Sequence, residues 1–383
     1  MIDLETMSVL IVDDMQSMRR TVRNMFKQLG LGREIRHAEN GKEAWNLLRS
    51  TPVDLAVVDW NMPVLNGVEL LNRIRENREM RDMPVIMITA ESEKDIVVEV
   101  AESEVDGYLL KPLTMKTLDA KVRQVVENAN NPDEVTQYLN KARDLEEAGS
   151  YKEAVEQVKL ALTKRPNASR ILRKMADLHF KIDKENVAEK CLKKAVAVNK
   201  DDAVARYQLG DLYRKKNDLD NANRYFMEAV SISPRAVPRA IELGEQLIQK
   251  GKADQAVKLF DKAIQRSTNS DKSREEIIAI YIQNREYAKA RKLLERYLKE
   301  QPERYDLAYK LGVAYMKSGD LKNAQTQFRK VDEHTEDNID AKLQLARIYY
   351  HQKRVFLADE VINQILRIDP QNEKALELRK KNI

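Results

Sequence analysis

Alanine recurs at a fixed spacing through the second part of this chain of 383 residues. It stands 34 residues apart at Ala154, Ala188, Ala222, Ala256, Ala290, Ala324 and Ala358. Chance does not produce such a series, and a period of this length is typical of a chain built from stacked supersecondary units. Because each unit buries its apolar face only against its neighbours, the second part must fold as an array of repeats.

Other residues return in the same frame. Leucine–glycine pairs occur at 209–210, 243–244 and 311–312, tyrosines stand at Tyr213, Tyr281, Tyr315 and Tyr349, and phenylalanines follow at Phe226, Phe260 and Phe328. Proline closes alternate units at Pro166, Pro234, Pro302 and Pro370. A unit of this length with two helices, small residues at their crossing and a closing proline is the signature of the tetratricopeptide repeat (TPR). The second part therefore resembles an all-α TPR superhelical solenoid.

Seven repeats are predicted, at 135–168, 169–202, 203–236, 237–270, 271–304, 305–338 and 339–372, with a C-terminal capping helix at 373–383. Ile278 stands where a small residue belongs, so looser packing is expected there. Arrays of this kind bind an extended peptide or protein in a concave groove lined by their first helices. Tyrosine and arginine are frequent anchors, which singles out Arg173, Tyr207, Arg214, Tyr309, Arg347 and Tyr350. The alternative interpretation is that these six residues are ordinary surface residues of amphipathic helices.

The first part alternates short apolar runs with helical periodicity. Strands are predicted at 8–12, 55–58, 85–89 and 108–111, with a weaker candidate at 35–38. Helices are predicted at 18–29, 42–48, 68–78, 95–103 and 117–127. This alternation predicts an α/β, doubly wound parallel sheet.

Polar residues stand where these strands end. They are Asp13, Asp14, Asp59, Thr89 and Lys111. The carboxyl ends of parallel strands meet at one edge, where such sheets bind ligands. Three carboxylates brought together repel one another unless a cation joins them, and oxygen ligands suit Mg²⁺. Helix capping explains one aspartate at a time, but not five polar strand ends at once.

The same residues belong to a family pattern. The motifs are Asp13-Asp14, Asp59-Trp60-Asn61-Met62-Pro63 with Gly67, Thr89-Ala90-Glu91 and Lys111-Pro112. In content and order they resemble the receiver domain of two-component response regulators over about residues 6–130. Arg19-Arg20 and Gly107-Tyr108 make the CheY-like chemotaxis receivers the nearest resemblance. The family implies a flavodoxin-like fold.

The resemblance also implies roles for individual residues. Asp59 would accept the phosphoryl group from a histidine kinase, and Lys111 and Thr89 would bind the phosphoryl oxygens. Tyr108 would follow Thr89 as a rotamer switch, and Glu91 would influence how long the phosphoryl group survives. The implied Mg²⁺ ligands are Asp14, Asp59 and the Asn61 carbonyl, with Asp13 acting through water. Pro112 suggests a cis bond after Lys111.

The two parts are predicted to meet at a short linker. We expect a receiver domain at 1–130 and a linker at 131–134, with Asn131 as an N-cap and Pro132 as the first helical residue. The first repeat would then sense changes in the fifth strand and last helix of the receiver. No bilayer-spanning apolar run or signal peptide is evident, so we expect a cytoplasmic protein without a membrane partner.

Charge separates the two parts. Residues 1–131 hold 17 Lys and Arg against 22 Asp and Glu, whereas the remainder holds 50 against 40. Because the basic residues are interspersed along helices, we expect solvated faces and no nucleic-acid partner, although a transcription regulator that uses this basic part stays an alternative. A second alternative is a phosphate sink, which drains phosphoryl groups from a kinase without signalling through the repeats. No output-enzyme motif occurs, so the preferred hypothesis is a phosphorylation-dependent signalling switch.

Overall fold

The structure is a computed structural model that describes residues 1–90, 105–335 and 337–381. The chain divides into two compact units, Met1–Ala236 and Val237–Ile383. The predicted linker at 131–134 lies inside the first unit. None of the described helices is long and apolar enough to cross a membrane.

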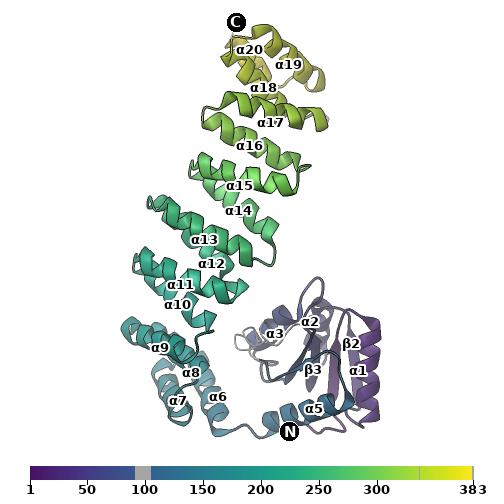
Figure 1. Cartoon of the computed structure of the whole chain (residues 1–383). Coiled ribbons are helices and arrows are strands. Elements are labelled where there is room, and N and C mark those ends of the chain that lie inside the picture. Colours follow the sequence, from purple (N-terminus) through teal and green to yellow (C-terminus); the bar gives the residue numbers. More distant parts are fainter. Residues whose placement is uncertain (91–104, 336, 382–383) are drawn as a thin grey trace. The chain divides into compact units, whose positions relative to one another are not determined.

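In the first unit, five strands form a parallel sheet with the order β2-β1-β3-β4-β5 (Figure 1). The strands are β1 (Ser8–Val12), β2 (Glu34–Ala38), β3 (Leu55–Asp59), β4 (Val85–Thr89) and β5 (Gly107–Leu110). The helices around them are α1 (Gln16–Gln28), α2 (Gly41–Ser50), α3 (Gly67–Glu76) and α5 (Met115–Asn130). The predicted doubly wound α/β fold is confirmed, and the helix predicted at 95–103 lies outside the described residues.

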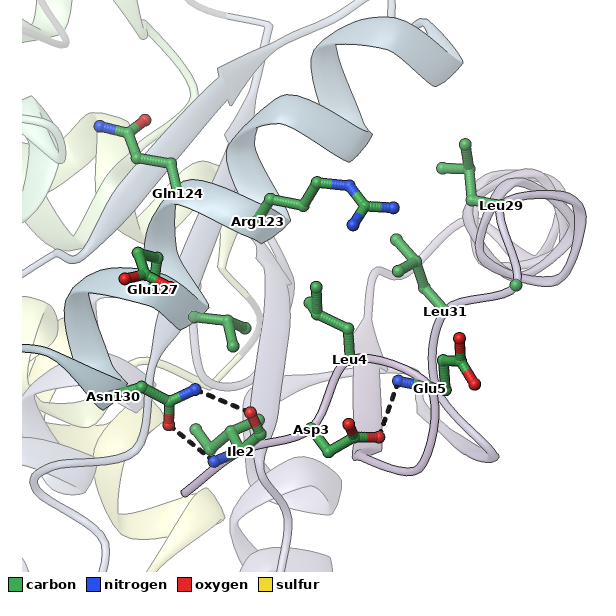
Figure 2. Close-up of a pocket in the computed structure, with 12 residues that line it drawn as sticks. Ile2, Asp3, Leu4, Glu5, Leu29, Leu31, Arg123, Gln124, Glu127 and Asn130 are labelled. Carbon is green, nitrogen blue, oxygen red and sulfur yellow. Dashed lines mark hydrogen bonds between the residues drawn. The ribbon is translucent and has the colours of Figure 1, made fainter.

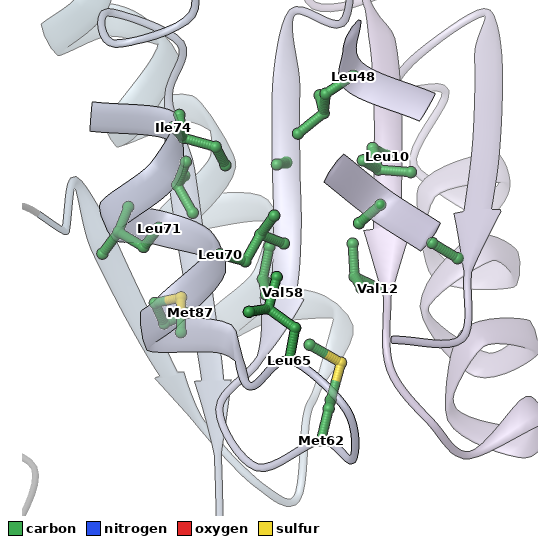
Figure 3. Close-up of a cluster of buried hydrophobic side chains, with 14 of the residues drawn as sticks. Leu10, Val12, Leu48, Val58, Met62, Leu65, Leu70, Leu71, Ile74 and Met87 are labelled. Carbon is green, nitrogen blue, oxygen red and sulfur yellow. The ribbon is translucent and has the colours of Figure 1, made fainter. Parts of the chain in front are cut away.

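Side chains of β1 show how the sheet is covered on both faces. Leu10 and Val12 belong to a buried cluster with residues of α2 and α3 (Figure 3). Val9 and Ile11 belong to a second cluster with residues of α1 and α5. Because successive side chains of a strand point to opposite faces, a run of apolar residues is required when both faces are covered.

The junction between the sheet and the repeats differs from the prediction in detail. Helix α5 continues to Asn130, and α6 (Glu134–Glu147) begins after Asp133. The Asp133 carboxylate accepts hydrogen bonds from the backbone N–H and the hydroxyl of Thr136. Asp133 is therefore the N-cap, and Pro132 precedes the helix instead of opening it. Asparagine and aspartate are comparable caps, and here the Asp133 side chain is the one that reaches a free N–H of the first turn.

Each predicted repeat contains two helices. In the first unit they are α6, α7 (Tyr151–Lys164), α8 (Ser169–Lys181), α9 (Glu185–Val198), α10 (Ala203–Lys215), α11 (Leu219–Ile232) and the 3₁₀ turn η1 (Pro234–Ala236). In the second unit they are α12 (Val237–Gln249), α13 (Ala253–Arg266), α14 (Ser270–Gln283), α15 (Tyr287–Glu300), α16 (Tyr305–Lys317), α17 (Leu321–His334), α18 (Ile339–His351), α19 (Val355–Ile368) and α20 (Glu373–Lys380). The two helices of every repeat pack against each other.

Glycine allows the closest helix crossings. An added Cβ would lie between 2.1 and 2.8 Å from a phenylalanine ring in three repeats, in the pairs Gly210 with Phe226, Gly244 with Phe260 and Gly312 with Phe328. Real Cβ atoms do not tolerate such distances, so the ring occupies the volume that a side chain at the glycine would need.

The other repeats fill the same two positions differently. Their pairs are Ala142 with Val158, Ala176 with Leu192, Ile278 with Leu294 and Ala346 with Ile362, and all eight side chains are fully buried. Where the first helix carries a residue larger than glycine, the second helix thus carries an aliphatic residue in place of phenylalanine. The looser packing expected at Ile278 is not seen in its burial, because the smaller Leu294 compensates for its volume.

The backbone conformation repeats with the same 34-residue period. One residue between the two helices of each repeat has a positive φ, between 56° and 82°, at Gly149, Asp183, Asn217, Gly251, Arg285, Gly319 and Lys353. Glycine adopts this left-handed conformation freely, whereas a residue with a Cβ is disfavoured by about 1–2 kcal/mol. The turn geometry is therefore kept even where the residue does not favour it.

Replacing Lys353 with glycine should stabilise the second unit. We expect Lys353→Gly to raise the free energy of unfolding by about 0.5–1 kcal/mol, since the gain in the left-handed turn exceeds the entropy that glycine adds to the unfolded chain. Gly319→Ala should lower it by a similar amount, because an added Cβ there meets no atom within 4 Å and only the backbone is affected. Urea unfolding followed by circular dichroism measures both. A destabilised Lys353→Gly variant would contradict this account.

Filling the crossing at Gly244 should destabilise the repeats. We expect Gly244→Leu to cost several kcal/mol, because its side chain overlaps the Phe260 ring. Gly244→Ala with Phe260→Leu should recover part of the stability lost in Gly244→Ala alone, since alanine and leucine form the pair at Ala176 and Leu192.

Gln249→Leu, an exposed change on the same helix, is the control for Gly244→Leu and should leave urea unfolding nearly unchanged. Unfolding of the N-terminal sheet together with the repeats would contradict the predicted domain boundary at 131–134.

Candidate functional site

Three buried polar side chains meet at the carboxyl edge of the sheet. Asp13 follows β1, Asp59 ends β3 and Thr89 ends β4, and they are 2%, 5% and 1% exposed. Parallel pairing brings these strand ends together, since Val12 is paired with Val58 and Asp59 with Ile88. The sheet register therefore assembles residues that are far apart in the sequence.

Lys111 extends from the residue after β5 into this group. Its Nζ lies 2.6 Å from Oδ1 of Asp59 and 3.2 Å from Oδ2 of Asp13. The Lys111 backbone N–H donates to the Thr89 carbonyl at 2.8 Å, which fixes the lysine beside β4. The bond from Lys111 to Pro112 is cis, as the sequence suggests. One ammonium group thus bridges two buried carboxylates.

The charges of these groups shift one another's titration. Burial raises the pKa of the Asp59 carboxyl above its usual range; Lys111 opposes this effect, and the charges of Asp13 and Asp14 add to it. Burial acts to lower the pKa of Lys111, but its contacts with Asp59 and Asp13 outweigh burial and raise that pKa. Three carboxylates, those of Asp13, Asp14 and Asp59, thus lie near the single ammonium group of Lys111.

This excess of carboxylate fits a divalent cation. The carboxylates of Asp13 and Asp59 are buried close to each other, and Asp14, the residue after Asp13, is exposed. Carboxylate and carbonyl oxygens are the ligands that Mg²⁺ prefers, and a few protein ligands suffice because Mg²⁺ keeps several waters. Among the described residues, three or more His, Cys, Asp or Glu side chains are nowhere gathered into a ready-made metal cage. The donor chemistry thus suits Mg²⁺ with a partly aqueous shell.

Arg19 holds the loop that carries the aspartate pair. Its Nη1 donates to the carbonyls of Asp13 and Asp14 at 2.7 and 3.0 Å, and its Nη2 donates to Glu39 at 2.6 Å. The Asp13 carboxylate also accepts the backbone N–H of Met15 at 2.8 Å. The residue patterns did not assign this role to Arg19. The available signal was an arginine in the first turn of the helix that follows the aspartate pair.

Gly67 allows α3 to begin against the phosphoacceptor candidate. Its N–H donates to the Trp60 carbonyl at 3.0 Å, and an added Cβ would lie 2.1 Å from the Asp59 carbonyl oxygen. Only a residue without a side chain can approach the end of β3 so closely.

The receiver motifs and the repeats both match known proteins. The response regulator receiver domain family matches residues 9–123, and tetratricopeptide repeat families match residues 203–235, 247–314, 281–337 and 315–381. Chemotaxis protein CheY-3 of Vibrio cholerae is 40% identical over 123 residues, which are 32% of this chain and 94% of that protein. Chemotaxis protein CheY of Pseudomonas aeruginosa is 38% identical over 124 residues, 32% of this chain and 99% of that protein. The chain belongs to the response regulator family.

A solved structure of a response regulator shows the same limited coverage. Chemotaxis protein CheY4 of Vibrio cholerae is 29% identical, with a TM-score of 0.30, and its match covers 31% of this chain and 98% of that chain. The curated relatives CheY-3 and CheY each match about a third of this chain, and this response regulator has TPR repeats C-terminal to the receiver domain.

Tyr108, the predicted switch residue of the receiver, faces outward. Its side chain is 39% exposed, and the Lys121 ammonium lies 5.9 Å from the ring centroid. Thr89 is buried at the end of the neighbouring strand. Glu91, the other predicted switch residue, lies outside the described residues. Pairing of β4 with β5 places Tyr108 opposite Met87, two residues before Thr89.

The predicted groove residues have different surroundings. Arg173 pairs with Asp202, Arg214 with Asp211, and Tyr309 packs against Phe328, whereas Tyr207 is partly buried and Arg347 is exposed. Tyr350 is only 8% exposed and donates to Asp359 at 2.5 Å. It belongs to the core cluster of the last repeat and so does not offer the exposed anchor that its first-helix position suggested.

The cavity in Figure 2 lies away from this site. It has a volume of about 710 Å³ and is lined by the N-terminal segment, the end of α1 and helix α5. The Asn130 side chain closes one side by hydrogen bonding to the Ile2 backbone. This cavity contains none of the predicted site residues.

Gly67→Ala should disturb the pocket. We expect the added methyl group to displace the end of β3 and lower the free energy of unfolding by about 1–3 kcal/mol, because it overlaps the Asp59 carbonyl. Thermal unfolding measures the loss. Asn72→Ala, an exposed change on the same helix, should have little effect. Equal stability of the two variants would show that the close approach is not required.

Proposed function

We propose that this response regulator is a phosphorylation-dependent switch in which Asp59 accepts a phosphoryl group and the TPR repeats hold a protein partner. The carrying observation is the buried Asp59 carboxylate at the sheet edge, 2.6 Å from the Lys111 ammonium. A histidine kinase is the proposed donor, in keeping with the family.

The pocket supplies what an aspartyl phosphate needs. An Asp59 oxygen would attack the phosphorus, and the bond to the leaving group would break with its electron pair going to that group. The transferring oxygens carry negative charge, and a nearby cation such as Lys111 stabilises it. The Thr89 hydroxyl, at the end of the adjacent strand, would donate to one of these oxygens once the phosphoryl group is attached.

Mg²⁺ would supply further charge neutralisation. Asp14, Asp59 and the Asn61 carbonyl are its proposed ligands, with Asp13 acting through water. Arg19 orients the backbone that carries both Asp13 and Asp14, so it is a positioning residue for this ligand set.

The repeats are the proposed output. No output enzyme domain is identified, whereas TPR families match most of the second part. Exposed Arg347 and partly buried Tyr207 and Tyr309 are the groove residues best placed to contact a peptide. A groove of this kind recognises a partner through buried anchors, so tyrosine is its most useful contact.

The nucleic-acid alternative is less well supported. Many cations of the repeats are paired with acids, as in Lys174 and Lys181 with Glu146, and Lys193 and Lys216 with Glu189. Such pairing leaves less positive charge for phosphates. The phosphate-sink alternative predicts that deletion of residues 132–383 leaves the cellular role intact.

Asp59→Asn should abolish phosphorylation. We expect the parent to gain one phosphoryl group from acetyl phosphate in Mg²⁺, whereas the variant should gain none, because an amide is not a nucleophile here. Intact-mass spectrometry measures the gain. Asp119→Asn, on the surface helix α5, should behave as the parent.

A direct binding measurement is independent of turnover. Trp60 is buried next to Asp59, so its fluorescence should respond to Mg²⁺ and to beryllofluoride in the parent, above the background from Trp45. Undiminished phosphorylation of Asp59→Asn would refute the assignment of the phosphoacceptor.

A further inference from the structure

Charged side chains of the first repeat pair with a loop of the receiver. The loop, residues 77–84 between α3 and β4, contributes Arg78, Arg81 and Asp82, and helix α6 contributes Arg143, Asp144 and Glu147. Arg81 donates to Asp144 at 2.9 Å and also pairs with Glu147. Arg143 donates to Asp82 at 2.7 Å. These contacts lie within the first compact unit.

Arg81 is the central residue of this contact. Its side chain is only 10% exposed, whereas that of Arg78 is 87% exposed and lies 3.8 Å from Glu147. An exposed ion pair contributes little, but Arg81 is largely buried although Asp144 and Glu147 are not, so removing these acids would leave its charge without compensation. The loop and the helix each present both signs of charge, so only one register satisfies all pairs.

Arg75 supports the backbone of this loop through hydrogen bonds. Its Nη1 donates to the carbonyls of Arg81 and Met83 at 2.8 and 2.9 Å, and its Nη2 donates to Asp106 at 2.5 Å. Asp106 also accepts the N–H of Val85, the first residue of β4, at 2.7 Å. One arginine therefore connects the residue that precedes β5 to the backbone of the loop.

Asp106 also has a connection to the repeats. Burial raises the pKa of its carboxyl, and the charges of Arg75 and of Arg170, at the start of α8, act in the opposite direction. Because Arg170 belongs to the second repeat, a charge of the repeats acts on the pKa of this receiver carboxylate.

We infer that residues 77–84 and helix α6 form an ionic latch between the receiver and the first repeat, and that Arg75 links this latch to Asp106 at the start of β5. The sequence indicated that the first repeat senses β5 and α5 directly. The hydrogen bonds describe a second route, through α3 and the loop that follows it. Any response of the latch to phosphorylation rests on the proposed function.

The latch can be measured by thiol cross-linking in the full chain with a short bifunctional maleimide. Asp82→Cys and Arg143→Cys, in a Cys191→Ser background, place one thiol on each side of the contact, and the spacer of the reagent replaces the length of the arginine side chain. The pairs of Arg81 with Asp144 and Glu147 stay in place. We expect rapid cross-linking at low salt and slower cross-linking at high salt, because salt screens ion pairs. Adding Arg81→Glu should slow the reaction about tenfold, because it places a negative charge beside Asp144 and Glu147.

Two further variants separate the latch from a general effect of charge. Glu147→Arg added to Arg81→Glu should restore part of the rate, since it replaces one repulsive contact with an attractive one. Arg73→Glu, the same charge change on the exposed side of α3, should leave the rate unchanged. Equal rates for Arg81→Glu and the parent, or a rate independent of salt, would overturn the latch.

Arg75 is tested as a positioning residue. Arg75→Gln should slow cross-linking because the loop loses its support, and Arg75→Lys should slow it less because lysine keeps the charge near Asp106. Unchanged cross-linking in Arg75→Gln would overturn the proposed link.

Beryllofluoride should change the cross-linking rate of the parent and not that of Arg75→Gln. Trp60 fluorescence reports binding of beryllofluoride separately. A fluorescence response without any change in cross-linking would overturn the coupling, whereas no fluorescence response would count against the proposed function, and the salt and charge-reversal experiments would still decide the latch.

Discussion

Burial of Asp13 and Asp59 around the Lys111 ammonium is the interaction on which the receiver site depends. Two buried carboxylates would repel each other strongly without a cation, and the lysine offsets this repulsion. Its position follows from the backbone hydrogen bond between Lys111 and Thr89. Pairing of β1, β3 and β4 then sets the distances among the acids. The chemistry proposed for Asp59 is therefore a consequence of the parallel sheet.

A different constraint controls the repeats, namely the volume shared by two positions sixteen residues apart. Glycine with phenylalanine, alanine with an aliphatic residue, and Ile278 with Leu294 all give buried crossings. The positive-φ turn persists in the same way, even at Arg285 and Lys353. The array thus keeps its geometry by compensating changes, which leaves its surface free to vary with a partner.

The connection between receiver and repeats is more than the short chain segment around Pro132. Arg81 is held by two acids of α6, while Arg75 holds the loop that carries it. Because the Arg81 side chain is largely buried while its two acids stay partly exposed, the strength of these pairs depends on their geometry, and they are sensitive to small displacements. A shift at the start of β5 would therefore reach α6 through a few hydrogen bonds, without a large movement of either part.

The sequence by itself determined the strand-end acids, the position of Lys111 and the period of the repeats, because these follow from spacing and from apolar runs that local structure must satisfy. Most helices and strands could be predicted for the same reason. It did not determine the roles of Arg19, Arg75 and Arg81, since an arginine on a helix or loop has the same local pattern whether it is solvated or buried. Nor did it show that Tyr350 is buried. Those outcomes depend on which distant backbone or carboxylate the fold places beside each side chain, and only tertiary packing decides that.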